Sequence, residues 1–379
     1  MSGESGKSGT SRGLRKILFQ VHTWLGLTVS IYMTFLFLTG TLVIFGDEIG
    51  SVFKPQMRGA PAASPAPMGD VYDAVRAAYP AFRQMTIRRQ DSPWLADEVR
   101  LQKPNRVWLD VWTDRATGEV QGATHYWGFR AVVRHIHVRM MSDLKIAYIL
   151  VSSLSLVLLY QIISGLVAYR RFWKGLARLP KSGSPSRAWW GALHRLAALW
   201  ALPVMLLIAL TSVLYFAESL GFSTKYPYAG GTAAPRETVL PDGFDGADMD
   251  RVVAAAQTAL PGLDVTRIQV TNNVKKGVIV GGELTSILTT PGANQVSVDP
   301  VTFEVLGARR GEDFGVLGRI DQSQDLLHFG TFGGVISRFI WLVGGLLGTL
   351  VAFSGVMVYS NRVAAQIGGT HATRVWKGM

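Results

Sequence analysis

The sequence predicts an α-helical membrane protein in which four transmembrane helices form a two-fold internal repeat and carry two small α+β domains outside the membrane. Three observations lead to this prediction: four long apolar stretches, an uneven distribution of charge, and landmarks that recur in both halves of the chain. A helix needs about 20 apolar residues to cross a membrane. Four stretches exceed this length without a charged residue, namely Thr23–Gly46, Ile146–Tyr169, Leu196–Ala217 and Phe339–Ser360.

The first stretch follows basic residues, as the apolar part of a signal peptide does, but it is too long and lacks a small-residue cleavage site. We therefore expect it to be a retained membrane anchor. The predicted order of segments is an N-terminus at 1–22, transmembrane helices at 23–46, 144–169, 194–217 and 328–360, soluble domains at 47–143 and 218–327, a basic loop at 170–193 and a tail at 361–379.

The net charge of +12 is concentrated in the short segments. Residues 170–195 hold seven Lys and Arg and no acid, whereas the segments 47–143 and 218–327 together hold 22 basic and 25 acidic residues. Because short basic loops stay in the cytoplasm, both termini and the basic loop are expected inside and both soluble domains outside. The basic excess therefore indicates topology, and nucleic acid is not an expected partner.

The chain contains no cysteine. This excludes a disulfide framework, thiolate zinc sites, iron–sulfur clusters and a covalently attached c-type heme. Any heme must therefore be bound noncovalently through histidine or methionine.

An internal repeat relates the two halves of the chain. His22 precedes Thr39-Gly40 by the same 17 residues that separate His194 from Thr211-Ser212. The later apolar stretches match through Ser164-Gly165 and Ser354-Gly355. Landmarks that recur in the same order indicate a duplication.

The soluble domains repeat as well. The segments 70–82 and 248–263 are apolar at helical spacing, and Asp-x-x-Thr-x-Glu-Val recurs within 112–123 and 297–308. We expect this motif to be a hairpin turn between strands such as Val107–Trp112 and Gln295–Val298. Each domain should thus pack one helix on a small antiparallel sheet, and the Pro/Ala-rich stretch 60–67 is expected to be a flexible linker.

Four of the seven histidines occupy equivalent places in the repeat. His22 and His194 are expected to start a helix at the cytoplasmic edge, and His137 and His328 to lie just outside the opposite edge. One imidazole from each of two helices forms the axial ligand pair of a six-coordinate heme. Zinc or copper also binds imidazole, but no carboxylate or cysteine lies within a helical turn of His22 or His194. Heme is therefore the favoured cofactor, with one histidine pair at each membrane face.

The segment RHIHVRMM (134–141) contains two candidates, His135 and His137. Residues i and i+2 of a helix face roughly opposite sides, so the two cannot bind one iron together. His328 precedes Ser354 by 26 residues and His137 precedes Ser164 by 27. This register selects His137 as the ligand and makes His135 either a neighbour at the heme edge or a residue that supports a ligand from outside.

Arginines and aromatic residues surround this histidine. Arg130, Arg134 and Arg139 either pair with heme propionates or an anionic substrate, or serve as ordinary interfacial anchors. The rings of Trp127 and Phe129 either cover the heme or form part of an interfacial aromatic belt.

Two stretches resemble the PepSY-associated transmembrane family. They are VHTWLGLTVSIYMTFLFLTGTLVIFGDEI near the start and LLHFGTFGGVISRFIWLVGGLLGTLVAFSGVMVYSNR near the end, and the soluble domains look like PepSY-type domains. Within the family the chain resembles FoxB-type ferrisiderophore reductases of the bacterial inner membrane. The resemblance implies two noncovalent b-type hemes with bis-histidine ligation, held by His22 with His194 and by His137 with His328. It also implies a ferric siderophore as the periplasmic substrate.

The expected chemistry is one-electron transfer, with a quinol or a cytoplasmic reductase as electron donor. The spaced glycines of VGGLLG (343–348) lie in an apolar stretch, where they favour close helix packing over nucleotide binding. With straight helices of about 1.5 Å per residue, the two histidine pairs would lie about 40 Å apart. Either the helices are broken, or the route is partly intermolecular, or aromatic residues relay the electron, among them Tyr32, Phe35, Trp200, Tyr215 and Trp341.

A non-enzymatic module is the alternative function, and a transporter is disfavoured. A non-enzymatic regulatory or binding module would tolerate substitution of the four histidines. A transporter would need ionisable residues in the helices, and the four apolar stretches contain none.

Overall fold

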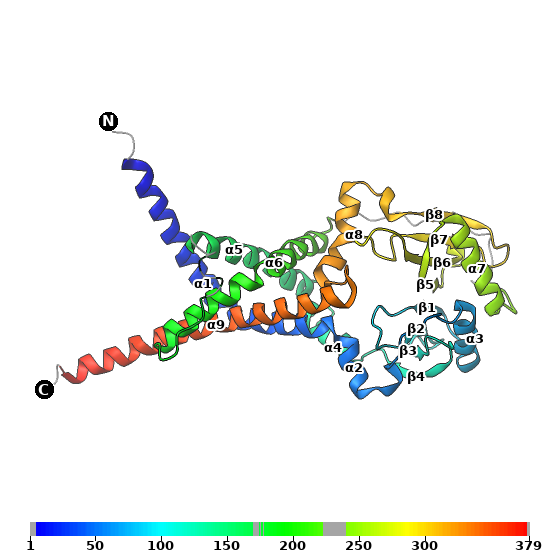
Figure 1. Cartoon of the computed structure of the whole chain (residues 1–379), viewed down its shortest axis with the longest axis horizontal. Helices are drawn as coiled ribbons and strands as arrows, with labels where there is room; N and C mark the ends of the chain where they lie inside the picture. Colours follow the sequence, from blue (N-terminus) through cyan, green and yellow to red (C-terminus); the bar gives the residue numbers. More distant parts are fainter. Residues whose placement is uncertain (1–4, 170–173, 175, 177, 223–239, 377–379) are drawn as a thin grey trace. The chain divides into compact units, whose positions relative to one another are not determined.

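The computed structural model describes residues 5–169, 174, 176, 178–222 and 240–376, and parts of the predicted N-terminus, basic loop and second soluble domain lie outside these residues. The chain divides into two compact units (Figure 1). The helical unit contains Met1–Ile44, Arg134–Phe222 and Phe339–Met379, and the sheet unit contains Phe45–Val133 and Ser223–Arg338.

Four of the described helices are long and apolar enough to cross a membrane. They are α1 (Ser5–Ile44), α5 (Lys145–Ala168), α6 (Ser186–Ser219) and α9 (Gly334–Trp376). The protein is thus an α-helical membrane protein with an α+β region, as the sequence predicts. Two helices begin earlier than expected, α1 at Ser5 and α6 at Ser186. His22 and His194 therefore lie well inside α1 and α6, and the expectation that they start a helix was wrong.

Glycines allow α9 to approach its neighbours in the helical unit. A Cβ atom at Gly344 would lie 2.7 Å from side-chain atoms of Val204 on α6, and one at Gly345 would collide with Thr41 on α1. A Cβ atom at Gly348 would lie 2.7 Å from Sδ of Met205. The close-packing interpretation of VGGLLG is therefore confirmed, since a larger side chain at these positions would push the helices apart.

A turn interrupts the helical path before α5 and before α9, the second transmembrane helix of each repeat. Helix α4 (Phe129–Arg139) ends at Met140 and Met141, which have φ angles of 51° and 61°, before α5 begins. Helix α8 (Val316–Phe329) ends at Gly330, whose φ is 68°, and α9 begins four residues later. The helices are therefore broken, as one of the three predicted explanations requires, and the other two stay predictions. His328 consequently lies on α8, and a continuous helix from residue 328 was wrong.

The sheet unit contains one antiparallel sheet with the strand order β4-β3-β2-β1-β5-β6-β7-β8 (Figure 1). The first half consists of α3 (Met68–Ala78), β1 (Gln84–Arg88), β2 (Asp97–Gln102), β3 (Trp108–Thr113) and β4 (Val120–His125). The second half consists of α7 (Gly246–Ala259), β5 (Asp264–Val270), β6 (Val278–Glu283), β7 (Gln295–Val298) and β8 (Val305–Arg309). Shorter helices are α2 (Gly46–Phe53), η1 (Pro55–Met57), η3 (Val274–Lys276) and η4 (Gly311–Asp313).

Each half repeats the predicted plan of one helix on a small antiparallel sheet, and the two halves join edge to edge. Strand β1 pairs with β5 in the register Ile87 to Ile268. The two helices also meet, because Gly69 of α3 donates its backbone N–H to Asp250 Oδ1 of α7 at 2.8 Å. A Cβ atom at Gly69 or Gly246 would strike the other helix. The junction therefore makes a single sheet of what the sequence predicts as two separate domains.

One core fills the space between the helices and one sheet face. Alternate strand residues such as Val99, Val111, Val280 and Val296 are fully buried there with Tyr72 of α3. Burial of each such side chain contributes about 1.5–3 kcal/mol. This alternation of buried residues is what holds the strands in register.

The predicted hairpin turns are present in both halves. Asp114 Oδ1 accepts the backbone N–H of Ala116 at 2.8 Å, and Asp299 Oδ1 accepts that of Val301 at 2.8 Å. By contrast, the Pro/Ala-rich stretch 60–67 is not a free linker. Ala66 is buried, and its backbone N–H donates to Arg115 O at 2.9 Å.

Candidate functional site

His22 projects from α1 toward α5. Its Nδ1 lies 2.9 Å from Ser164 Oγ, and the Ser164 hydroxyl donates to Tyr160 O at 2.7 Å. A hydroxyl whose proton is already donated accepts the next hydrogen bond, so Nδ1 of His22 is the protonated nitrogen. The Nε2 atom then keeps its lone pair, which is the state required of a metal-ligating imidazole.

His194 is held in the same way between α6 and α9. Its Nδ1 lies 3.0 Å from the carbonyl oxygen of Val351 and 3.1 Å from Ser354 Oγ. Because a carbonyl oxygen only accepts, the proton of His194 is on Nδ1. The partner serines Ser164 and Ser354 are both fully buried.

The two histidine contacts are repeats of each other. The serine–glycine landmarks used to align the two halves supply both partners, and each glycine stands beside the histidine ring. A Cβ atom at Gly165 would lie 3.5 Å from Cε1 of His22, and one at Gly355 would lie 3.9 Å from Cε1 of His194. Both predicted ligands of the first pair thus lie in the helical unit, each with its Nδ1 held by a neighbouring helix. Their pairing around one heme stays a prediction.

His137 packs against the other end of α1. Its Nδ1 lies 3.0 Å from Leu36 O and 3.2 Å from Thr39 Oγ1, so this ring also carries its proton on Nδ1. A Cβ atom at Gly40 would lie 2.7 Å from the ring. Burial lowers the pKa of His137 to about 4, which keeps the imidazole neutral and able to bind a metal at neutral pH.

His135 points elsewhere, as the register argument predicts. Its Nε2 lies 3.6 Å from Oδ1 of Asp143, which precedes α5. The flanking arginines are also placed. Arg134 is exposed, and Arg139 contacts Asp143 O at 3.4 Å and the ring of Tyr148 at 5.9 Å.

His328 is the one predicted ligand outside the helical unit. It lies on α8 in the sheet unit, with its ring edge-on to Phe329 at 5.4 Å between centroids. Arg130, in the same unit, forms an ion pair with Asp47 at 3.2 Å. The pairing of His137 with His328 stays a prediction.

The contact between His137 and Leu36 fixes how far His137 lies from His22 along α1. Leu36 lies 14 residues beyond His22 on the same helix, α1. At about 1.5 Å per residue this is roughly 21 Å along the helix axis, in place of the about 40 Å expected for straight helices. The turn at Met140 and Met141 produces this difference by folding α4 back against α1.

The donor set fits heme. Among the residues that the structure describes, no group of three or more His, Asp or Glu side chains could hold a metal ion. Heme needs only two protein ligands, because the porphyrin supplies the other four donors. His22 and His194, with free Nε2 atoms and glycines beside their rings, meet this need.

The hydrogen-bond partners Ser164, Ser354, Thr39 and Leu36 were not predicted as part of the site. For three of them the signal was present, because they belong to landmarks that recur at fixed distances from histidines. Leu36 contributes only its backbone, which no side-chain pattern reveals.

Comparison with known proteins identifies the class. The family described as the PepSY-associated TM region matches residues 19–362, so the chain belongs to this family. No curated protein matches the chain.

Proposed function

We propose that this protein is an inner-membrane di-heme b oxidoreductase that passes electrons to the periplasm and reduces siderophore-bound Fe(III) to Fe(II), which releases the iron. The observation that carries the proposal is that three histidine rings share one hydrogen-bonding arrangement. In His22, His137 and His194, Nδ1 is bonded to an acceptor on a neighbouring helix, and Nε2 is left as the ligand atom. The resemblance to FoxB-type reductases supports the siderophore as substrate.

In this proposal His22 and His194 would hold one heme, and His137 and His328 would hold the second. Bound heme would supply one-electron transfer. The contribution of the chain is to fix each imidazole in its tautomer and to surround it with apolar helix faces. Reduction releases the metal because the hard oxygen donors of siderophores bind Fe(II) far less well than Fe(III).

The charge distribution supports the orientation. The basic N-terminus, loop and tail would lie in the cytoplasm, and the nearly neutral sheet unit would lie in the periplasm. A quinol or a cytoplasmic reductase would donate the electrons. Arg134 would be available to an anionic substrate or a propionate, since its side chain is exposed.

Absorption spectroscopy of the purified protein tests the cofactor. We expect a bis-histidine b-type spectrum and a pyridine hemochrome that corresponds to two hemes per chain. A colourless preparation from heme-replete cells would contradict the proposal and would favour a non-enzymatic regulatory or binding module.

Anaerobic mixing tests the substrate. The dithionite-reduced protein should be reoxidised by at least one of ferrioxamine, ferrichrome and ferric citrate, with Fe(II) trapped by a colorimetric chelator. A coloured protein that none of these compounds reoxidises would contradict the siderophore reductase while leaving heme binding intact.

A further inference from the structure

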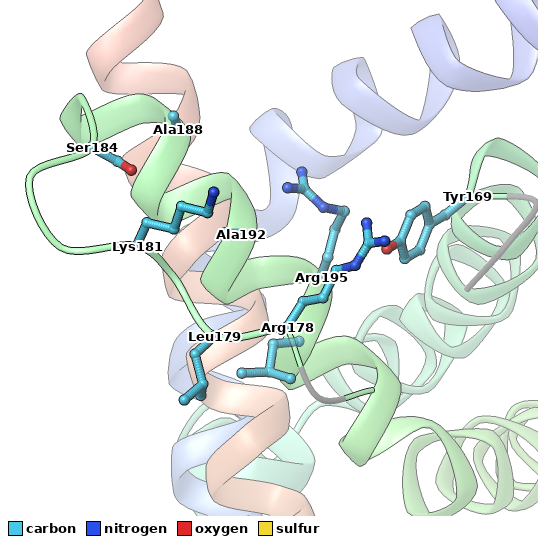
Figure 2. Close-up of a pocket in the computed structure, with 9 residues that line it drawn as sticks. Tyr169, Arg178, Leu179, Lys181, Ser184, Ala188, Ala192 and Arg195 are labelled. Carbon is cyan, nitrogen blue, oxygen red and sulfur yellow. The ribbon is translucent and has the colours of Figure 1, made fainter. Parts of the chain in front are cut away.

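A basic cavity of about 560 Å³ lies in the helical unit, between the end of α5, the first turns of α6 and the segment before α6. Three cationic side chains line it, those of Arg178, Lys181 and Arg195. Figure 2 shows Lys181 and Ser184 on one side of the cavity, and Arg178, Arg195 and Tyr169 on the other. The cations thus converge on one space from two separate segments of the chain.

No acidic side chain among the described residues of the helical unit stands beside these cations. The sequence contains no Asp or Glu from residue 144 to residue 217. The two described acids of the helical unit are Asp143, before α5, and Glu218, at the end of α6, and both stand at the helix ends opposite to the cavity. The described part of the helical unit therefore supplies no counter-anion for the cavity.

The cavity is separate from the proposed heme ligands. Arg195 follows His194 directly, and successive residues of a helix point about 100° apart. The ring of His194 is bonded to α9, whereas the guanidinium of Arg195 lies over the ring of Tyr169 at the end of α5, 6.0 Å from its centroid. The two side chains leave α6 on different sides.

Apolar side chains border the cationic cluster. Leu179, which lines the cavity, is 76% exposed, and Trp200 on α6 is 61% exposed. Trp200 donates its indole N–H to Leu176 O at 2.9 Å, which holds the segment before α6 along the lipid-facing part of this helix. A ligand of this cavity meets cations at one end and an apolar, lipid-facing surface at the other.

We propose that the cavity binds the phosphate of an anionic phospholipid, with the acyl chains along Leu179 and Trp200. Basic pockets between transmembrane helices bind anionic headgroups in this way. A free phosphate shares the charge but would gain nothing from the exposed apolar border. The proposal does not depend on heme, because none of the lining side chains is a proposed ligand.

Native mass spectrometry of the full-length protein tests the proposal. The probes are phosphatidylglycerol, the zwitterionic phosphatidylcholine and inorganic phosphate, each added to delipidated protein. The double variant Arg178→Gln with Lys181→Gln is compared with the charge-matched control Lys16→Gln with Arg187→Gln, whose residues do not line the cavity. Size-exclusion profiles and melting temperatures show whether both variants fold.

We expect the wild type and the control to retain phosphatidylglycerol in preference to phosphatidylcholine. In the double variant the ratio of bound phosphatidylglycerol to bound phosphatidylcholine should be roughly tenfold lower. Three results would overturn the proposal. They are equal binding of both lipids by the wild type, an equal loss in the control and the double variant, and displacement of phosphatidylglycerol by inorganic phosphate. If the double variant fails to fold, Lys181→Gln with Arg195→Gln is used with the same expectations.

Discussion

The two halves of the sheet unit share their frame and differ in charge. On the face opposite α3 and α7, the first half carries Glu98, Arg100 and Asp110, linked by ion pairs of 2.6 Å and 2.7 Å. The strand registers place Ile279 and Gly281 at the positions equivalent to Glu98 and Arg100. The duplicated frame is therefore independent of this ion network, since the second half forms the same strands without it.

The two helix pairs of the helical unit, α1 with α5 and α6 with α9, keep a contact where the half-sheets differ. His22 with Ser164 and His194 with Ser354 keep the same contact in both repeats. A contact that is kept in both repeats, while the charges of the two half-sheets differ, indicates a requirement at the histidine itself. Contacts shared by both repeats therefore mark the candidate site, and contacts that differ between them belong to the scaffold.

Removal of a ligand should have the largest effect. We expect His22→Ala and His194→Ala each to reduce the pyridine hemochrome from about two hemes per chain to about one, because a bis-histidine site does not hold heme with one axial ligand. His125→Ala, an exposed residue at the end of β4, is the control and should retain both hemes. Full heme content in either ligand variant would show that the substituted histidine is not a heme ligand.

A carboxyl group in each half-sheet should respond to pH in opposite ways. Burial opposes ionisation of Glu98, but the guanidinium groups of Arg88 and Arg100 lower its pKa below the usual value of 4.5. Burial instead raises the pKa of Glu283 on β6, and Asp91 and Asp264 add to this. Glu98 therefore stabilises the fold above pH 4.5, and this stability is lost as the pH falls through its lowered pKa. Glu283 has the reverse effect. Its raised pKa means that the folded chain takes up this proton at a higher pH than the unfolded chain, so ionised Glu283 destabilises the fold at neutral pH and this cost disappears as the pH falls.

Chemical denaturation at several pH values measures both effects. Glu98→Gln should destabilise the protein at pH 7 by about 3 kcal/mol, because it leaves two arginines without their buried partner, and the difference should shrink below pH 4.5. Glu283→Gln should be neutral or slightly stabilising at pH 7. Equal losses in both variants would show that the two half-sheets do not differ electrostatically.

Two glycines beside histidine rings should differ in their tolerance of a methyl group. At Gly40 a Cβ atom would lie 2.7 Å from His137 and must displace the ring, which costs about 1–3 kcal/mol. At Gly165 it would lie 3.5 Å from His22, an ordinary van der Waals contact. Gly40→Ala should therefore lower the melting temperature and alter the spectrum of one heme, while Gly165→Ala leaves both unchanged. The reverse order would contradict the placement of His137.

The smallest effect should distinguish the two serines. Ser164→Ala removes the hydroxyl bonded to Nδ1 of His22, whereas in Ser354→Ala the ring of His194 keeps Val351 O as acceptor. Loss of such a hydrogen bond costs about 1 kcal/mol. We expect a shift in midpoint potential and in the low-spin electron paramagnetic resonance signal of one heme in Ser164→Ala, and a smaller shift in Ser354→Ala. Identical shifts would indicate that the carbonyl does not hold the His194 ring.

Much of the fold could be predicted from the sequence, because its signals are local. Long apolar stretches predict the four transmembrane helices, and the Asp-x-x-Thr-x-Glu-Val motif predicts both hairpins. The pairing of β1 with β5 could not be predicted, since the edge residues of a strand look alike whether the edge is paired or open. A broken helix was one of the expectations, but the position of the break before α5 could not be predicted, because Met140 and Met141 are residues that normally continue a helix.

For the candidate site, the sequence predicts which histidines to consider but not the contacts that they make. The register of His137 against Ser164 chose between two histidines, and the structure turns His137 toward α1 and His135 toward Asp143. The contact of His137 with Leu36 depends on a tertiary turn that no local spacing contains.

The junction between β1 and β5 has a consequence for biosynthesis. Strand β1 is completed well over a hundred residues before its partner, so the first half-sheet emerges with an open strand edge along β1. Open edges invite pairing with other chains. The nascent protein is therefore most vulnerable to aggregation in the interval between its two halves, and a chain truncated after the first repeat would carry that vulnerability permanently.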